Sequence, residues 1–230
     1  ASNETQTLTV SAVSSNTSII PDPAVTYTSP DATGTLAFTP VANANDVANG
    51  GPTTITVSVS DGTDTVQQTF TVTVASVNDA PTISDIPDGQ STNEDTASTA
   101  IAFTVGDVET AAGTLALTGA SSDQALVPDA NISFGGSGTN RTVTITPALN
   151  QNGGPITITV TVQDEGGLTA SDTFTFSVTA VNDAPTVDDP ADVAISEDAL
   201  EQTVNLTGIG TGASNETQTL TVSAVSSNTS

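Results

Sequence analysis

The chain has 230 residues, of which 26 are Asp or Glu, one is basic and none is His or Cys. A formal net charge of −25 excludes nucleic acid as an expected partner, because phosphate binding needs Lys and Arg. The lack of Cys excludes disulfides and thiolate metal sites, and no apolar run is long enough to predict membrane insertion.

The predicted elements are short strands separated by turns. TTITVSVS (53–60) and VQQTFTVTVASV (66–77) flank the turn DGTD. Further along, turn clusters at GDVETAAG, FGGSGTN, NQNGG and QDEGG separate five alternating segments, at 98–105, 114–120, 141–147, 155–162 and 172–181. Alternation with a period of two and regularly spaced turns predicts an all-β fold of seven-stranded β-sandwiches, and no useful length of sequence has a helical period.

Internal repeats set the domain boundaries. Residues 1–18 recur unchanged at 213–230, an offset of 212 residues, and VNDAPT occurs at both 77–82 and 181–186, an offset of 104. We therefore predict three parts: the later part of a 108-residue module at 1–78, a complete module at 79–182 (the central module), and the opening part of the next 108-residue module at 183–230.

The two outer parts are incomplete in complementary ways. The first lacks the equivalents of 187–212, which are expected to form strands A and B, and the last contains those strands but little else. Two explanations follow: a continuous chain of neighbouring modules, or separate subunits that complete each other's sandwiches in a head-to-tail fibre. The first is favoured, because in the second the duplicated 18 residues would compete for one place.

The charge itself predicts a ligand. Compact folding at this charge works against self-repulsion, and an acidic chain can instead remain disordered. Because the regular alternation argues against disorder, bound cations are the expected remedy, and sites built from oxygen ligands favour Ca²⁺.

The acidic and amide side chains of the central module are expected to gather at its two ends. The upper end combines the preceding linker with the B–C and F–G turns, and contributes Asn78, Asp79, Asp107, Glu109 and Asp164. The lower end combines the A–B and E–F turns with the following linker, and contributes Glu94, Asp95, Asn150, Asn152, Asn182 and Asp183. Calcium takes six to eight such oxygens, although Asp, Asn and Gly are also frequent in turns for conformational reasons alone.

The order of these motifs resembles the bacterial cadherin-like tandem repeats of large surface and secreted proteins. VNDAPT is followed by an ED pair, a D-x-E, a late D-x-G and VNDAPT again. The resemblance implies Ig-like sandwiches in a rod, calcium between modules, and an extracellular adhesin stalk or cell-surface fibre. It adds ligand candidates outside the central module, namely Asp61 at the late Asp position and Glu197 with Asp198 at the ED pair.

The 108-residue module departs from the family pattern. It has GTGASNE where the central module has D-x-E, which leaves Asn215 and Glu216 as weaker ligand candidates. Its upper junction is therefore expected to bind fewer calcium ions, or to bind them less tightly.

Three functions follow from these features. The first is a calcium-stiffened spacer, which needs length and stiffness but no unique site. The second is a module that binds ice, glycan or another surface through Thr-rich sheet faces, although alternating Thr is also ordinary strand surface. An enzyme is not expected, because the chain has neither His nor Cys, and a glycosidase built on carboxylates usually needs more aromatic residues than one Tyr and six Phe.

Overall fold

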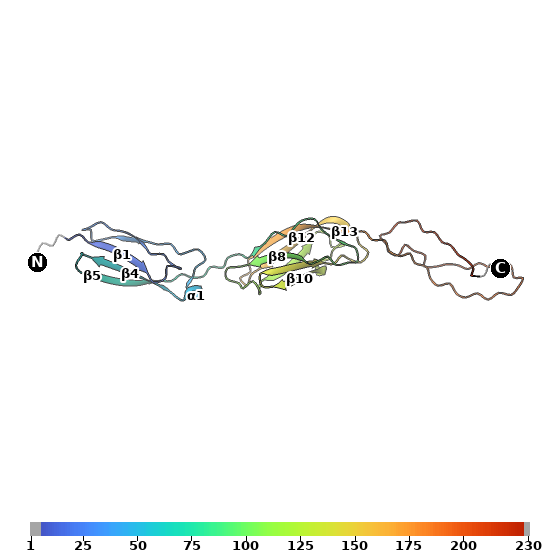
Figure 1. The fold of residues 1–230 in the computed structure, drawn as a ribbon, viewed down its shortest axis with the longest axis horizontal. Helices are drawn as coiled ribbons and strands as arrows, with labels where there is room; N and C mark the ends of the chain where they lie inside the picture. The colour runs from blue at the N-terminus through green and yellow to red at the C-terminus, as the bar shows by residue number, and fades with distance from the viewer. Residues whose placement is uncertain (1–5, 228–230) are drawn as a thin grey trace. The chain divides into compact units, whose positions relative to one another are not determined.

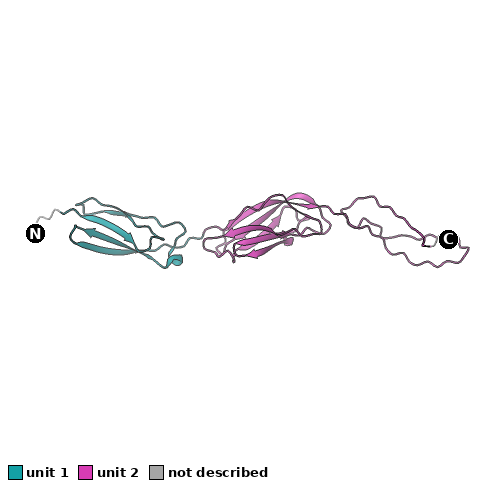
Figure 2. Cartoon of the chain, viewed as in Figure 1, with its two compact units in different colours: residues 1–78 teal, residues 79–230 magenta. Residues whose placement is uncertain are grey.

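The computed structural model describes residues 6–227 and divides the chain into two compact units, 1–78 and 79–230 (Figure 2). Almost all of the regular secondary structure among the described residues is β (Figure 1). None of the helices among the described residues is both long enough and apolar enough to cross a membrane.

The central module is a sandwich of two four-stranded sheets. One sheet has the order β10-β11-β8-β6 and the other β7-β13-β12-β9. Short β6 and β7 share the expected role of the first strand, one in each sheet. The strands and one 3₁₀ helix are β6 (Thr82–Ile83), β7 (Gln90–Asn93), β8 (Ile101–Gly106), β9 (Ala116–Ser121), η1 (Asp129–Asn131), β10 (Ile132–Ser137), β11 (Asn140–Ile145), β12 (Gly153–Gln163) and β13 (Thr169–Thr179).

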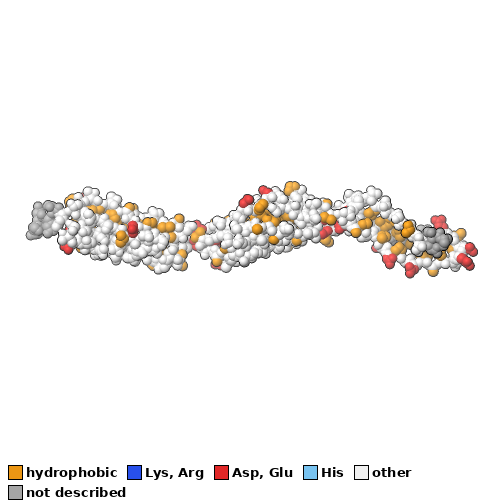
Figure 3. Space-filling model, viewed as in Figure 1, with side chains coloured by type: hydrophobic (Ala, Val, Ile, Leu, Met, Phe, Trp, Pro, Cys, Tyr) orange, Lys and Arg blue, Asp and Glu red, His pale blue; other side chains and the backbone are white. Residues whose placement is uncertain are grey.

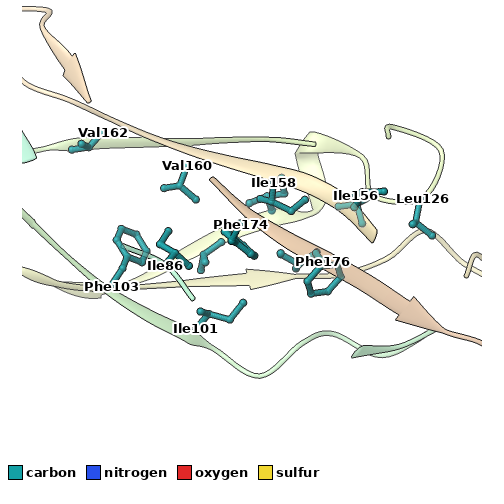
Figure 4. Close-up of a cluster of buried hydrophobic side chains, with 14 of the residues drawn as sticks. Ile86, Ile101, Phe103, Leu126, Ile156, Ile158, Val160, Val162, Phe174 and Phe176 are labelled. Atoms are coloured by element: carbon teal, nitrogen blue, oxygen red, sulfur yellow. The ribbon is translucent and has the colours of Figure 1, made fainter. Parts of the chain in front are cut away.

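Alternating side chains build the core between these sheets. In β8 every second residue is buried, and in β12 and β13 the Ile, Val and Phe residues point inward while Thr and Ser point outward. Each apolar side chain that is fully buried contributes about 1.5–3 kcal/mol. Figure 4 shows part of this core, including Ile101, Phe103, Ile158, Val160, Phe174 and Phe176.

Unit 1–78 repeats the later part of this plan. Its sheets have the orders β1-β4-β5 and β2-β3, with β1 (Thr9–Ser14), β2 (Ala24–Thr26), β3 (Thr35–Ala37), β4 (Thr53–Ser60) and β5 (Thr65–Val72). A four-residue helix, α1 (Asp46–Asn49), precedes β4, and the Asn45 side chain caps it by accepting from the Ala48 N–H at 2.9 Å. The core is small, with Ala12, Ile19, Ile20 and Ile55 as its buried residues.

The C-terminal segment has little regular structure. Between residues 183 and 227 the structure contains one isolated antiparallel bridge, Thr186↔Gly210, and no strand. The sequence predicted strands here, and that prediction is wrong for the described residues of this segment. The physical reason is that an alternating segment becomes a stable strand when a neighbouring sheet pairs with it.

A second correction concerns FGGSGTN, which we predicted to be a turn. Its first four residues, Phe134–Ser137, belong to β10, which pairs with β11 from Ile132↔Ile145 to Ser137↔Asn140. The tight hairpin turn is shorter than predicted and lies at Gly138 and Thr139.

Candidate functional site

Glu94 organises the lower end of the central module. It follows β7, and its side chain is buried although it is a carboxylate. It accepts hydrogen bonds from the Val181 N–H at 2.5 Å, from Asn215 Nδ2 at 2.6 Å and from Asn152 Nδ2 at 3.4 Å. These bonds lower the pKa of Glu94, with the Val181 N–H as the largest cause. Glu94 thus joins the end of the module to a loop of the next one.

Asp183 lies in the linker at the same junction. Its N–H donates to the Glu216 carboxylate at 2.7 Å, while its Oδ2 is buried and finds no hydrogen-bond partner among residues 6–227. Desolvation raises the pKa of Asp183, and the charges of Glu216, Asp95 and Glu94 raise it further. An anionic oxygen surrounded by other anions and lacking a donor is an environment that a cation would relieve.

Amide side chains complete this junction. Gln218 Nε2 donates to Asn182 Oδ1 at 3.0 Å and to Glu216 Oε2 at 2.9 Å, and the Oδ1 of Asn215 is buried without a partner among the described residues. A shallow pocket here is lined by residues from the module, the linker and the following loop, namely Glu94, Asn152, Ala180, Val181, Asn182, Asn215, Glu216, Thr217 and Gln218. We call this set, together with Asp95 and Asp183, the lower junction.

Asp95 and Asn150 have a conformational role at the edge of the lower junction. Asp95 Oδ1 accepts from the Asn150 N–H at 2.7 Å, and both residues have positive φ, 58° and 53°. Asp and Asn tolerate this left-handed conformation better than most residues. The bond fixes the two turns of the lower end to each other.

The upper end of the central module holds a similar linker contact. The Asp79 N–H donates to Glu109 Oε2 at 3.0 Å, as the Asp183 N–H does to Glu216. Asp107 Oδ1 accepts from the N–H groups of Glu109 at 2.9 Å and Thr110 at 2.6 Å, and its Oδ2 is buried without a partner in the described part of the chain.

Asp164 belongs to the same end by topology, in the turn between β12 and β13. It is buried, and its Oδ1 accepts from the Leu168 N–H at 2.8 Å. This bond closes the hairpin, so at least one oxygen of Asp164 has a purely structural role.

The remaining predicted ligands are Asp61, Asn78, Glu197 and Asp198. Asp61 caps its own turn, with Oδ1 accepting from the N–H groups of Thr63 at 2.8 Å and Asp64 at 2.7 Å, and these bonds lower the pKa of Asp61. Asn78 is the last residue of the first unit. Glu197 and Asp198 are exposed in the C-terminal segment, where Asp198 has a positive φ of 63° like its counterpart Asp95.

The sequence did not point to two polar residues that the structure places at module ends. Gln218 is one, because a Gln in an alternating segment is ordinary strand surface. The other is Asp46 in α1, which is buried and accepts from the Val74 N–H at 3.0 Å through Oδ2, while Oδ1 has no partner among the described residues. The central module has no counterpart of α1, so comparison of the repeats could not predict this carboxylate.

The oxygens at the lower junction fit a hard cation in their chemistry, but the carboxylates do not converge as a closed site. Among residues 6–227, no group of three or more His, Cys, Asp or Glu side chains is arranged to hold a metal ion. Instead, the carboxylates of Glu94 and Glu216 accept hydrogen bonds from side-chain amides. The unpartnered oxygens of Asp183 and Asn215 are the atoms free to take a cation.

Two packed sheets, antiparallel except for the parallel β7–β13 pair, define the central module as an Ig-like β-sandwich. Residues 78–177 match the family model described as a bacterial Ig domain. The match covers less than half of the chain. No curated protein matches the chain.

Several solved structures are similar to the chain at low sequence identity. The titin domains Z1Z2 in complex with telethonin are 14% identical, with 76% of this chain and 83% of that chain covered and a TM-score of 0.37. The surface layer protein SbsC, domains 1–6, is 16% identical, with 78% and 21% covered and a TM-score of 0.34. A protocadherin gamma B7 cis-dimer structure is 20% identical, with 88% and 49% covered and a TM-score of 0.45.

Proposed function

We propose that this chain is a calcium-stiffened structural repeat of an extracellular fibre or adhesin stalk. The observation that supports it best is Asp183, a linker carboxylate with one buried, unpartnered oxygen beside Glu216, Asp95 and Glu94. A calcium ion would neutralise this repulsion. Because the lower junction takes residues from the module, the linker and the next loop, the ion would also join consecutive modules.

The repeated sequence supports a structural rather than a catalytic role. A 212-residue unit that recurs unchanged over 18 residues adds length without adding a distinct site. The match of residues 78–177 to a bacterial Ig domain agrees with a structural module. The chain also lacks His and Cys, the commonest general base and the most reactive nucleophile.

Calcium titration of the full chain tests the proposal. Isothermal calorimetry in Ca²⁺, with Mg²⁺ as a control for simple charge screening, is expected to show binding that Asp183→Asn weakens and that substitution of the exposed Glu165 by Gln leaves unchanged. Limited proteolysis should show that chelator increases cleavage at residues 180–184. Equal cleavage in calcium and in excess chelator, with no heat of binding, would refute the calcium part of the proposal.

A second candidate function is suggested by the outer face of the β12–β13 hairpin. Threonines face each other across these strands in the pairs Thr157↔Thr175 and Thr159↔Thr173. This regular hydroxyl array would suit ice or a glycan surface, although it is also good exposed strand sequence. Measurement of thermal hysteresis and of glycan binding with the full chain, compared with a Thr157→Lys variant, separates the two functions.

A further inference from the structure

Arg141 is the only basic residue of the chain, set against 26 Asp and Glu residues. Figure 3 shows acidic side chains exposed on one face of the chain. A lone cation in so acidic a chain is expected to pair with a carboxylate. Arg141 does not: it is half-buried on β11, and both hydrogen bonds that its guanidinium makes within the described residues go to backbone carbonyls.

The strand register turns the Arg141 side chain inward. Arg141 pairs with Phe103 on β8 and with Gly136 on β10, and residues directly opposite each other in a ladder lie on the same face of the sheet. Phe103 is buried in the core. Arg141 therefore stands at the upper end of the core, next to Gly136, which has no side chain to fill the space.

The guanidinium reaches from one sheet to the loop that enters the other. Its Nη2 donates to Ala112 O at 2.7 Å and to Gly113 O at 3.2 Å, and this loop leads into β9 of the second sheet. Its Nε is buried and has no partner among residues 6–227. A half-buried charge needs such hydrogen bonds, and bonds from a charged donor are stronger than neutral ones. Arg141 thus ties the two sheets together at the upper end.

The loop that Arg141 holds, residues 107–113, also contacts the linker. Asp107 Oδ1 closes its first turn by accepting from the Glu109 N–H at 2.9 Å. Glu109 Oε2 in turn accepts from the Asp79 N–H at 3.0 Å. Neither contact fixes the loop to the facing strand β11, whereas the two bonds from Arg141 do so.

The 108-residue module has no side chain that could do the same at this position. TLAFTP (35–40) aligns with TVTITP (142–147), so Gly34 corresponds to Arg141. A Cβ at Gly34 would lie 3.1 Å from Thr26 O and 3.3 Å from Tyr27 Cδ2, which leaves little room for a long side chain. The arginine therefore accompanies the loop that contains D-x-E, and not the loop GTGASNE.

We propose that Arg141 is a positioning residue for the upper end of the central module. Its guanidinium holds loop 107–113 against β11, so that Glu109 accepts the linker N–H of Asp79 and Asp107 keeps Oδ2 buried and without a protein donor. Without this tether, repulsion between the carboxylates of Asp107 and Glu109 favours an open loop. The role at the linker needs no metal, whereas the presentation of Asp107 to calcium rests on the proposed function.

Hydrogen-exchange mass spectrometry of the full chain in chelator tests the positioning role. Arg141→Met keeps a long side chain but removes the charge and the donors. Exchange should become about tenfold faster in loop 107–113 and linker 78–82, because bonds from a charged donor are lost, and should stay unchanged in β12 and β13. Arg141→Lys keeps a charged donor and should exchange at rates closer to those of the native chain than to those of Arg141→Met.

Thr144→Val is the matched control, because Thr144 lies on the outer side of the same strand, between the buried Val143 and Ile145. It should leave exchange unchanged in all these regions. Unchanged loop exchange in Arg141→Met would overturn the proposal. An equal increase in β12 and β13 would also overturn it, since that result shows a general loss of stability, and so would equal rates in the lysine and methionine variants.

Trypsin gives an independent readout, because it cleaves after Lys and Arg and Arg141 is the only such residue. The native chain should resist trypsin under conditions in which Glu165→Arg, which places a second arginine in the exposed β12–β13 turn, is cut at that turn. Cleavage of the native chain after Arg141 at a comparable rate would show that its side chain is not held, and would contradict the inference.

Calcium titration separates this inference from the proposed function. In a chain that carries Asp183→Asn, which weakens the lower junction, the addition of Arg141→Met should reduce the remaining Ca²⁺ affinity about tenfold. Affinity unchanged by Arg141→Met would overturn the part of the inference that concerns Asp107. If the native chain binds no calcium, the proposed function fails, and the exchange experiment in chelator still decides the role of Arg141 at the linker.

Discussion

Removal of the Glu94 side chain should destabilise the end of the central module. The carboxylate is buried and accepts from the Val181 N–H at 2.5 Å and from Asn215 Nδ2 at 2.6 Å. A hydrogen bond to a charged group contributes about 1.5–3 kcal/mol, and a buried N–H left unpaired costs about 1–3 kcal/mol. These terms overlap, so we expect Glu94→Ala to cost about 2–3 kcal/mol.

Urea unfolding followed by hydrogen-exchange mass spectrometry measures this loss, since peptides from residues 169–181 report on β13 and the linker. The matched control is Glu165→Ala, which removes an exposed glutamate from the β12–β13 turn. If both variants unfold at the same urea concentration as the native chain, Glu94 does not hold the junction.

The pH dependence gives an independent check on Glu94. Its pKa is lowered in the folded state, so its contribution is fully present above the ordinary pKa of a glutamate. The contribution is lost as the pH falls through the lower, folded-state pKa. The difference between the native chain and Glu94→Ala should therefore shrink in acid. A difference that is constant from neutral to acid pH would show that the charge is not the cause.

Three further variants test the linker and the core. Asp183 has a raised pKa, so its ionisation opposes folding as the pH rises through that pKa. In chelator, Asp183→Asn should therefore melt at a higher temperature than the native chain at neutral pH but not in acid. In calcium at neutral pH, the native chain should instead melt at the higher temperature. Phe176→Ala, in the centre of the core, should cost about 3–5 kcal/mol in urea unfolding. Gly119→Ala would place Cβ 2.5 Å from Ile132 Cγ2 and should cost about 1–3 kcal/mol, whereas Gly113→Ala, which meets no atom within 4 Å, should be close to neutral by the same measurement.

The strands that alternate strictly could be predicted from the sequence. The segment 53–60 is β4 without adjustment, and 155–162 lies within β12. β10 was missed because Gly135 and Gly136 have turn composition, and Gly136 has a φ of 84°. What makes these glycines part of a strand is pairing with Thr142 and Arg141 across the hairpin, and a local pattern does not encode that pairing.

The candidate site could be predicted only as a location. Turn composition and strand order indicated that the carboxylates lie at the module ends. They could not indicate which oxygens are already used as hydrogen-bond acceptors, as in Asp61 and Asp95. They also could not reveal that the side-chain amide of Asn215 donates to Glu94 and that of Gln218 to Glu216, because these bonds depend on side-chain geometry.

At the two linkers, different loops each supply a glutamate that accepts a hydrogen bond from the linker aspartate. In each, the N–H of the linker aspartate donates to a glutamate, Glu109 in one case and Glu216 in the other, although the loops DVET and GASNET differ in length and composition. The loops differ in the oxygen that remains unpartnered, which is a charged one in Asp107 and a neutral one in Asn215. Calcium affinity depends on the number of charged ligands. This difference is therefore the physical reason to expect weaker calcium binding above the 108-residue module, although the bond from the linker aspartate N–H to a glutamate is present at both linkers.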